Sequence, residues 1–402
     1  MRRWPTVVLI LICVLLVTTP AAAAPVADVT DIAVFYTFGQ EATFQARLRP
    51  AEDWAEVNLF LQPQGHPARV LPVMPDQDGG IILRYNLREN PLPVFTPVTY
   101  WFQVTNAQQQ EYTSSQTTFV YDDNRFDWRQ LTSGIFEVHW YDRDVSFGQE
   151  VLNTAEKGLQ SAQTYLPGTV NGPVRIFVYA SATDFQQALQ NSATTWAVGH
   201  ASPALNTIVV SIPPGPEEML ELERQIPHEL AHLAQSSLAG DGYAKIPTWL
   251  QEGSASLAEL YPNADYESVL ENAVETNSLI PLAQLCEPFP REASAAFLSY
   301  AESAAFVRYL HQNYGTSGLG KLVQIYADGV GCAEGPQRAW GLSLNELEYR
   351  WRQESLGMNM AGLVINNLLP YLILLALLVA VPILVAAAMR RRGNPGRPVK
   401  QA

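Results

Sequence analysis

The sequence predicts an α+β protein with three parts: an N-terminal antiparallel β-sandwich (Ig/FnIII-like), a mixed domain with a small sheet and a helical half, and one C-terminal transmembrane helix. Short stretches of alternating apolar and polar residues fill 28–122, strands followed by helical stretches fill 130–356, and a nearly continuous apolar run covers 368–389. A chain of 402 residues is long enough for such separate cores.

The composition limits the classes of function. Hydrophobic residues make up 48% of the chain and aromatic residues 10%, which is typical of a globular protein. The net charge is −14, and a nucleic-acid binder needs a basic face instead. We therefore expect no nucleic-acid partner, and the acidity indicates solubility rather than a particular substrate.

The β-sandwich domain is predicted from six or seven short strands. Turn-rich spacers, the clearest at 75–80, separate them, and this spacing is typical of a β-sandwich. The domain carries no visible catalytic cluster, so we expect a spacer, a docking surface or a packing partner. The clearest strands are expected at 32–38, 42–48, 55–61, 81–87, 98–104 and 115–121.

The mixed domain begins with strands and ends with helices. Strands are expected at 134–141, 174–179 and 206–212, with helices at 147–166 and 183–190 between them. From about Glu217 onward almost every stretch has a helical pattern. A small sheet followed by a helical half is an α+β layout.

Both ends of the chain carry membrane signals. Residues 1–24 combine two arginines, an apolar run and four alanines, which is the pattern of a secretory signal peptide. The apolar run 368–389 covers about 30 Å as a helix, the thickness of a bilayer core; a buried core helix is the alternative. Arg390, Arg391 and Arg392 predict a cytoplasmic tail, 390–402. We therefore expect a single-pass protein of the cell membrane with its bulk outside the cell.

The cysteines fit an exported protein. Without the signal peptide only Cys286 and Cys332 remain. A disulfide between them would close a loop of about 45 residues and contribute about 3–4 kcal/mol. Two free buried thiols are the alternative.

The sequence His228-Glu-Leu-Ala-His232 is the first candidate for chemistry. On a helix, residues four apart lie about 40° apart around the axis, so both imidazoles reach one metal ion. Glu229 is rotated by about 100° from His228, which places it next to the metal as a base rather than as a ligand. A solvent-exposed His/Glu helix face is the alternative.

The third ligand is expected from a second helix. Pro247 followed by Thr248 predicts a helix start, and Glu252 then falls within the first two turns. The small residues at 253–256 would let this helix approach the first one closely. Glu259 is a competing carboxylate. Three protein ligands leave a fourth position open, as in catalytic Zn²⁺ sites.

The two motifs, His228-Glu-Leu-Ala-His232 and Trp249-Leu-Gln-Glu-Gly-Ser-Ala255, resemble those of the gluzincin clan of zinc metallopeptidases, closest to its peptidase MA-like branch. The resemblance covers about 130–355 and implies a zincin-like domain. It implies that His228, His232 and Glu252 bind zinc and that Glu229 is the general base and acid. It also implies that 206–212 is the edge strand lining the cleft, where an extended peptide can pair.

Three departures from the family pattern matter. The sequence has no Gly-x-Met-x-Asn exopeptidase motif, which favours an endopeptidase. Gln251 stands where an asparagine is common in relatives. Ser256 stands where thermolysin-like relatives have an aspartate, so the group that orients a ligand histidine must come from elsewhere.

A donor for the oxyanion of the tetrahedral intermediate is also needed. Tyr300 is the first choice, since it is expected before a helix in a region where relatives keep a tyrosine; a packed aromatic is its alternative role. His139 and His66 are expected to be structural or surface residues. The rivals of Tyr300 are Tyr243, Tyr309, His200 and His311.

The predicted function is a membrane-anchored, extracytoplasmic zinc metallopeptidase. Zinc would polarise water and the scissile carbonyl of a peptide or protein substrate, and Glu229 would carry the proton to the leaving amine. The alternative is a non-catalytic cell-surface binding or adhesion protein that retains the metallopeptidase fold.

Overall fold

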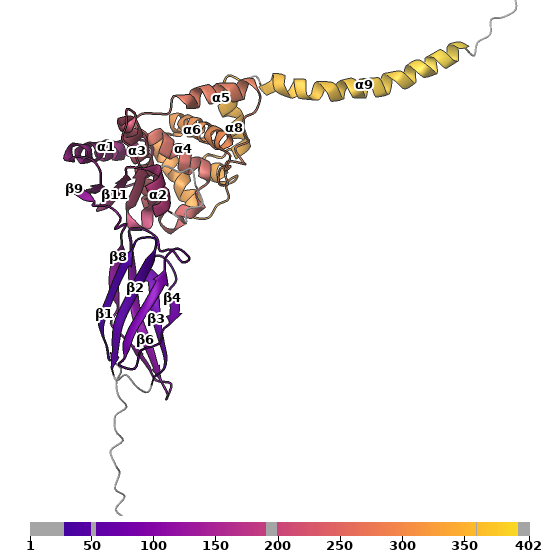
Figure 1. The fold of residues 1–402 in the computed structure, drawn as a ribbon. Coiled ribbons are helices and arrows are strands. Elements are labelled where there is room, and N and C mark those ends of the chain that lie inside the picture. Colours follow the sequence, from indigo (N-terminus) through magenta and orange to yellow (C-terminus); the bar gives the residue numbers. More distant parts are fainter. Residues whose placement is uncertain (1–27, 50–53, 190–198, 359, 393–402) are drawn as a thin grey trace, which may run out of the picture. The chain divides into compact units, whose positions relative to one another are not determined.

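The computed structural model describes residues 28–49, 54–189, 199–358 and 360–392, and in the last of these ranges it describes the side chains of 369–385. The predicted signal peptide, 1–24, and most of the predicted tail, 390–402, lie outside the described residues. The chain divides into two compact units, Met1–Arg125 and Phe126–Ala402 (Figure 1).

The first unit consists of two antiparallel sheets. One has the order β1-β2-β5 and the other β4-β3-β6-β7, with β8 also paired to β6. Alternate residues of β2 and β6 are buried, and the rings of Phe44 and Tyr100 meet at 5.1 Å, so the two sheets pack face to face. The predicted N-terminal antiparallel sheets are confirmed. The strands are β1 (Asp28–Thr37), β2 (Glu41–Arg49), β3 (Trp54–Pro63), β4 (Arg69–Pro72), β5 (Gly80–Asn86), β6 (Thr96–Asn106), β7 (Glu111–Thr113) and β8 (Thr117–Tyr121).

The second unit begins with a five-stranded sheet of order β12-β13-β11-β10-β9. The three inner strands are parallel, and the two outer strands run antiparallel to them. The inner strands are rich in buried aliphatic residues, as expected where both faces are covered. The strands are β9 (Arg129–Ser133), β10 (Phe136–Trp140), β11 (Val174–Tyr179), β12 (Gly199–Ser202) and β13 (Thr207–Ser211).

The sheet corrects one expectation. The stretch 206–212 was predicted as the edge strand of the cleft, and this is wrong, because β13 pairs on both sides with β11 and β12. The edge strand is β12. Its sequence, Gly-His-Ala-Ser, has no apolar alternation, so only its pairing with β13 reveals it as a strand.

Two helices cover one face of this sheet and share its core. They are α1 (Val145–Tyr165) and α3 (Glu218–Ala239). Val151 of α1 and Leu230 of α3 are buried in one cluster with Ile176 and Ile208 of the sheet. The short helix α2 (Ala182–Ala188) follows β11. This core anchors the helix that carries the His-Glu-x-x-His sequence.

The helical half surrounds a second core. Its long helix, α6, combines two helical stretches across Gly315, which has a φ of 68° that favours glycine. Trp249 of α4, Phe306 of α6 and Trp351 of α8 are fully buried together. The predicted mixed α+β fold with a helical second half is therefore confirmed. The helices are α4 (Thr248–Ala258), α5 (Asp265–Glu275), α6 (Ala293–Ala327), α7 (Gly335–Trp340) and α8 (Leu344–Glu354).

The two remaining cysteines form a disulfide. Cys286 and Cys332 are bonded, with their Cα atoms 6.1 Å apart, and the alternative of two free thiols is excluded. Both cysteines pack against the second core. The disulfide therefore lies beside Trp249, at the start of α4, whose indole Nε1 donates to Cys332 Sγ at 3.4 Å.

The last helix is α9 (Met360–Arg392), which contains the predicted membrane span 368–389. In the part of the chain that the structure describes, no helix is both long and apolar enough to cross a membrane. The predicted span is therefore not supported by the structure.

Candidate metal centre

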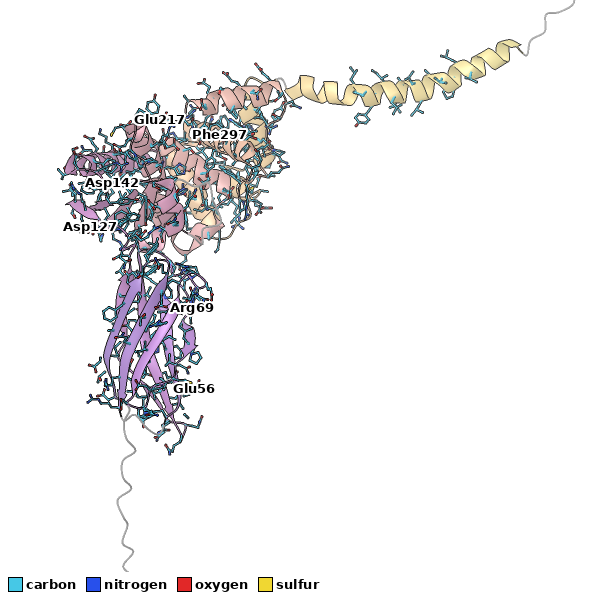
Figure 2. The ribbon with its side chains drawn as sticks, in the orientation of Figure 1. Glu56, Arg69, Asp127, Asp142, Glu217 and Phe297 are labelled. Atoms are coloured by element: carbon cyan, nitrogen blue, oxygen red, sulfur yellow. A yellow bond between two sulfur atoms is a disulfide. The ribbon has the colours of Figure 1, made fainter. Side chains whose placement is uncertain are left out.

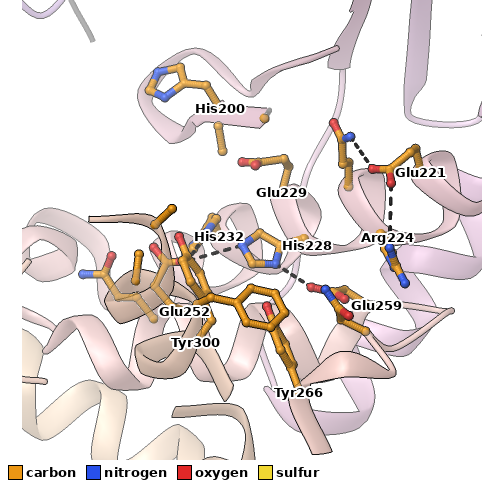
Figure 3. Close-up of a pocket in the computed structure, with 18 of the residues that line it drawn as sticks. His200, Glu221, Arg224, His228, Glu229, His232, Glu252, Glu259, Tyr266 and Tyr300 are labelled. Carbon is orange, nitrogen blue, oxygen red and sulfur yellow. Dashed lines mark hydrogen bonds and ion pairs between the residues drawn. The ribbon is translucent and has the colours of Figure 1, made fainter. Parts of the chain in front are cut away.

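The helix α3 presents both histidines to one side. Leu230 and Leu233 are buried in the core beneath it, as the helical period requires. The rings of His228 and His232 meet with centroids 5.1 Å apart. The helix is thus fixed by its apolar face, and its imidazoles point into the cavity shown in Figure 3.

The helix α4 brings Glu252 to the same place. It starts after Pro247 without a side-chain cap. Instead, the N–H groups of Thr248 and Trp249 donate to the carbonyls of Cys286 and Leu285, at 3.2 and 3.0 Å. These bonds satisfy two of the amides that a helix start leaves unpaired. The segment with the disulfide therefore holds the start of the Glu252 helix.

The small residues of α4 allow close packing against two helices, α3 and α6. Ala255 packs with Ala231 of α3, as the prediction of a close approach required. Gly253 instead faces α6, where an added Cβ would lie 2.5 Å from the carbonyl oxygen of Ser303. The Glu252 helix therefore packs closely between the histidine helix and α6.

His228, His232 and Glu252 form a group whose potential ligand atoms all lie within 4.8 Å of one another. Glu252 Oε2 lies 3.3 Å from His228 Nε2 and 3.8 Å from His232 Nε2. Ligands held tetrahedrally about 2.0–2.1 Å from a Zn²⁺ ion lie about 3.3 Å apart. Two imidazoles and a carboxylate at this spacing therefore fit a zinc ion.

The Nδ1 atom of each histidine has its own hydrogen-bond partner. His228 Nδ1 lies 3.1 Å from Glu259 Oε1, and because a carboxylate only accepts, the imidazole N–H donates. The Tyr243 hydroxyl lies 3.2 Å from His232 Nδ1. Each bond turns Nε2 toward Glu252, as ligand histidines require.

Glu259 thus differs from its predicted role as a competing ligand. The helix α4 ends at Ala258, and Glu259 follows it in an extended conformation. Its carboxylate therefore reaches the far side of His228 and supplies the orienting group that Ser256 cannot. Gln251, the other departure, donates to the Ile246 carbonyl at 2.8 Å and so ties α4 to the segment that carries Tyr243.

Burial and charge set the protonation of the three candidate ligands. Burial lowers the pKa of His232 to about 4. Burial opposes the charge on His228, but hydrogen bonds to Glu252 and Glu259 outweigh it and raise the pKa of His228 well above its usual value. Burial likewise opposes the charge on Glu252, but His232 and His228 lower its pKa. His232 is therefore neutral, and a metal ion has one proton on His228 to displace.

Glu229 lies in the same cavity but outside the ligand group. Its carboxylate accepts a hydrogen bond from the backbone N–H of Ala201 on β12, and burial raises its pKa to about 7. An added Cβ on Gly199 would lie 2.3 Å from Glu229 Oε1. The edge strand therefore passes so close to Glu229 that glycine is needed there.

Tyr300 lies inside α6, not before a helix, and lines the cavity. It hydrogen-bonds with Glu252, and burial raises its pKa, so it stays protonated. The rival Tyr243 instead meets His232, while His200 lines the cavity from β12. The other two rivals bond elsewhere: Tyr309 donates to Glu354 at 2.9 Å, and His311 contacts Thr316.

The two histidines that were expected to be structural or surface residues lie away from the cavity. His139 stacks on Phe177 of the sheet with ring centroids 4.3 Å apart. His66 is exposed in the first unit.

The cavity has a volume of about 550 Å³ and is lined by β12, α3, α4, α5 and α6. Four residues that line this cavity were not predicted from the sequence. Phe297 on α6 (Figure 2) and Tyr266 on α5 (Figure 3) lie with their ring centroids 5.0 Å apart. Asn263 lies just before α5, and Arg224 lies on α3, one turn before His228. No local pattern distinguishes these residues from an ordinary helix surface.

Comparisons with solved structures give weak similarities. A mutant of the M1 zinc metallopeptidase from Deinococcus radiodurans is 13% identical, with a TM-score of 0.34, over 83% of this chain and 96% of that chain. A polysaccharide deacetylase from Bacillus cereus is 6% identical, with a TM-score of 0.20, over 43% and 58%. The cycloalternan-degrading enzyme from Trueperella pyogenes is 17% identical, with a TM-score of 0.17, over 27% and 13%. At such TM-scores none of the three carries an argument about function.

No curated protein matches the chain. The family model of the Peptidase MA superfamily, by contrast, matches residues 154–356. This range is just over half of the 402 residues, and it contains both helices of the candidate metal centre. The chain therefore belongs to the Peptidase MA superfamily, and its second unit has a metallopeptidase-like fold.

Proposed function

We propose that the chain is a zinc-dependent endopeptidase. One observation carries the proposal: His228, His232 and Glu252 converge within 4.8 Å, and the carboxylate of Glu229 lines the same cavity. Two imidazoles with a glutamate form a known catalytic ligand set for zinc. The family match supports a peptidase rather than another zinc enzyme.

The two histidines and Glu252 would hold the metal. When bound, zinc supplies Lewis-acid chemistry that lowers the pKa of water and polarises a carbonyl. Glu259 and Tyr243 keep each imidazole turned toward the site, through contacts of 3.1 and 3.2 Å at Nδ1. These two residues are positioning residues, since they act through the histidines.

Glu229 is the proposed base and acid. Its carboxylate accepts a proton from the attacking water and then delivers that proton to the nitrogen of the leaving amine. The amide of Ala201 holds the carboxylate by a hydrogen bond. Tyr300 stays protonated, and we assign it as the donor to the oxyanion of the tetrahedral intermediate.

The substrate backbone would pair with β12. The amide of Ala201 bonds Glu229, so this residue turns its backbone polar groups away from β13. Because such groups alternate along a strand, those of Gly199 face the same way. An extended peptide adding to this edge would lie next to Glu229. The absence of a Gly-x-Met-x-Asn exopeptidase motif favours cleavage within a chain.

The proposed location is the outer side of the cell membrane. The support is in the sequence: the signal-peptide pattern at 1–24, the apolar run 368–389 and the arginines after it. Extraction of membranes with alkaline carbonate tests the anchor. Release of the full chain into the soluble fraction would contradict it.

The test of the function is Glu229→Gln in the full chain. We expect bound zinc to be unchanged and cleavage of a peptide library to be abolished, while the wild type is active and sensitive to a chelator. Equal turnover of the variant would refute the role of Glu229. Zinc bound by the wild type without cleavage of any peptide would favour the binding or adhesion protein.

A further inference from the structure

Arg224 is the only arginine or lysine in the described lining of the metal-centre cavity. It lies on α3 four residues before His228, which separates the two by about 6 Å along the helix axis. An extended peptide advances by about 3.3 Å per residue. A substrate group that is bound by Arg224 therefore lies about two residues away from the scissile bond.

The guanidinium of Arg224 is held at one edge and open at the other. Its Nε donates to the Tyr261 carbonyl at 3.3 Å, and its Cζ lies 5.8 Å from the centroid of the Tyr261 ring. Nη1 lies 3.7 Å from Glu221 Oε1 (Figure 3), which is too long for a hydrogen bond. Within the described ranges Nη2 has no partner. The side chain is 22% exposed, so a ligand can reach this open edge.

Two uncharged donors line the same cavity close to Arg224. The segment that Arg224 holds at Tyr261 continues to Asn263, whose Oδ1 accepts from the Asp265 amide at 3.1 Å. The Nδ2 group of Asn263 is therefore left as a donor. Burial raises the pKa of Tyr266, so its hydroxyl stays protonated and can also donate. A guanidinium, an amide and a hydroxyl together suit an anion with two oxygens.

The acidic side chains of the cavity have other partners. Glu259 accepts from the first histidine at 3.1 Å, and Glu221 accepts from Gln225 at 2.8 Å. Glu252 and Glu229 are the proposed zinc ligand and the proposed base. A bound zinc ion would add its positive charge to that of Arg224. The open edge of the guanidinium is therefore left for a ligand.

We propose that Arg224, with Asn263 and Tyr266, binds a carboxylate of the substrate about two residues from the scissile bond. A guanidinium offers two parallel N–H donors that match the two oxygens of a carboxylate. The carboxylate belongs either to an aspartate or glutamate side chain or to the C-terminus of the substrate. The proposal rests on the proposed function, since it names the substrate class of that site.

The experiment measures binding apart from turnover. The zinc-loaded full chain with Glu229→Gln is titrated with three fluorescent eight-residue peptides of alanine and leucine, which are blocked at both ends and carry glutamate, glutamine or lysine at one central position. A fourth peptide carries the glutamine and has a free C-terminus. We expect one or both of the carboxylate peptides to bind at least about tenfold more tightly than the blocked glutamine peptide, because hydrogen bonds between charged groups are the stronger ones.

Substitutions of Arg224 test its role directly. Arg224→Gln should remove the preference and leave binding of the blocked glutamine peptide within about twofold. Arg224→Glu should reverse the preference and favour the lysine peptide, which a merely structural role would not do. The control Arg338→Gln removes an exposed arginine of α7 outside the cavity lining and should keep the preference. Bound zinc should be unchanged in all three variants.

The outcomes separate the two proposals. Equal binding of the carboxylate peptides and the blocked glutamine peptide, or a preference that persists in Arg224→Gln, overturns the carboxylate site. Tighter binding of the glutamate peptide alone assigns the carboxylate to a side chain, tighter binding of the free-terminus peptide alone assigns it to the chain end, and either result supports the site.

A preference that depends on Arg224 supports the carboxylate site even if the wild type cleaves no peptide, in which case only the proposed function fails. Cleavage of a peptide library by the wild type, with neither acidic residues nor chain ends enriched within about three residues of the cleaved bonds, overturns the carboxylate site and leaves the function standing.

Discussion

At the scale of single residues, Glu259 completes the environment of His228. Its carboxylate accepts from Nδ1 at 3.1 Å and leaves Nε2 directed at Glu252. A carboxylate in this place fixes the ring and strengthens it as a ligand. The role follows from the end of α4 at Ala258, which frees Glu259 from the helix.

Replacing Glu259 tests this role. Glu259→Ala should weaken zinc binding by about 10–100-fold, because such orienting partners typically contribute that much. Glu259→Gln keeps an acceptor for the N–H and should lose less. The measurement is competition for zinc with a chromogenic chelator. An alanine variant with wild-type zinc affinity would show that the contact is incidental.

Gly199 tests the placement of the base. An added Cβ would lie 2.3 Å from Glu229 Oε1, so Gly199→Ala must displace the carboxylate. A displacement of about 1 Å can lower a rate about a hundredfold. We expect kcat to fall while bound zinc stays at the wild-type level, as measured by peptide cleavage and metal analysis. Ser202→Ala, on the same strand, is the control that should keep activity.

At the scale of elements, the segment before α6 holds α4 in place. Its carbonyls at Leu285 and Cys286 accept from the first amides of α4, and the disulfide to Cys332 fixes the segment. The position of Glu252 therefore depends on contacts far along the chain. The disulfide therefore contributes to the position of the candidate metal ligand Glu252 through the start of α4.

Removing the disulfide should affect both stability and metal binding. In Cys286→Ser with Cys332→Ser the free energy of unfolding should fall by about 3–4 kcal/mol, since the loop is no longer closed in the unfolded chain. Zinc affinity should fall as well, because the start of α4 is held less firmly. Denaturant unfolding and chelator competition measure the two effects. Reduced stability with unchanged zinc affinity would show that the disulfide does not influence the position of α4.

At the scale of the whole molecule, a buried carboxyl makes stability depend on pH. Glu302 on α6 is fully buried and accepts from the Ile280 amide at 2.8 Å. Burial raises its pKa to about 8 from 4.5, despite the bond to Ile280 and the charge of Arg352. The folded chain therefore holds a proton between these pH values that the unfolded chain has lost.

The stability of the folded chain is therefore expected to fall as pH rises through this range. The contribution of Glu302 is fully present below about pH 4.5 and is lost as pH rises toward about 8, with a total on the order of a few kcal/mol. Glu302→Gln does not titrate, so its free energy of unfolding should fall less over this range. Denaturant titrations at several pH values measure the difference. Parallel pH profiles for the two proteins would refute the assignment.

Much of the candidate site could be predicted from local patterns. His228 and His232 share a helix face because the helical period acts over four residues, and Pro247 marks the helix that carries Glu252. The orienting groups could not be predicted in this way. Glu259 and Tyr243 meet their histidines only because α4 ends at one particular residue and packs on α3.

The sequence by itself determined which residues are candidate metal ligands, the order of the sheet and the helices, and the family. These depend on short-range periodicity and on motif spacing, which are local properties of the sequence and do not require distant segments to meet. Only the tertiary structure decided that β12 is the edge strand and that the cysteines pair. Each of these requires segments distant in sequence to meet, and long-range packing alone decides which of them do.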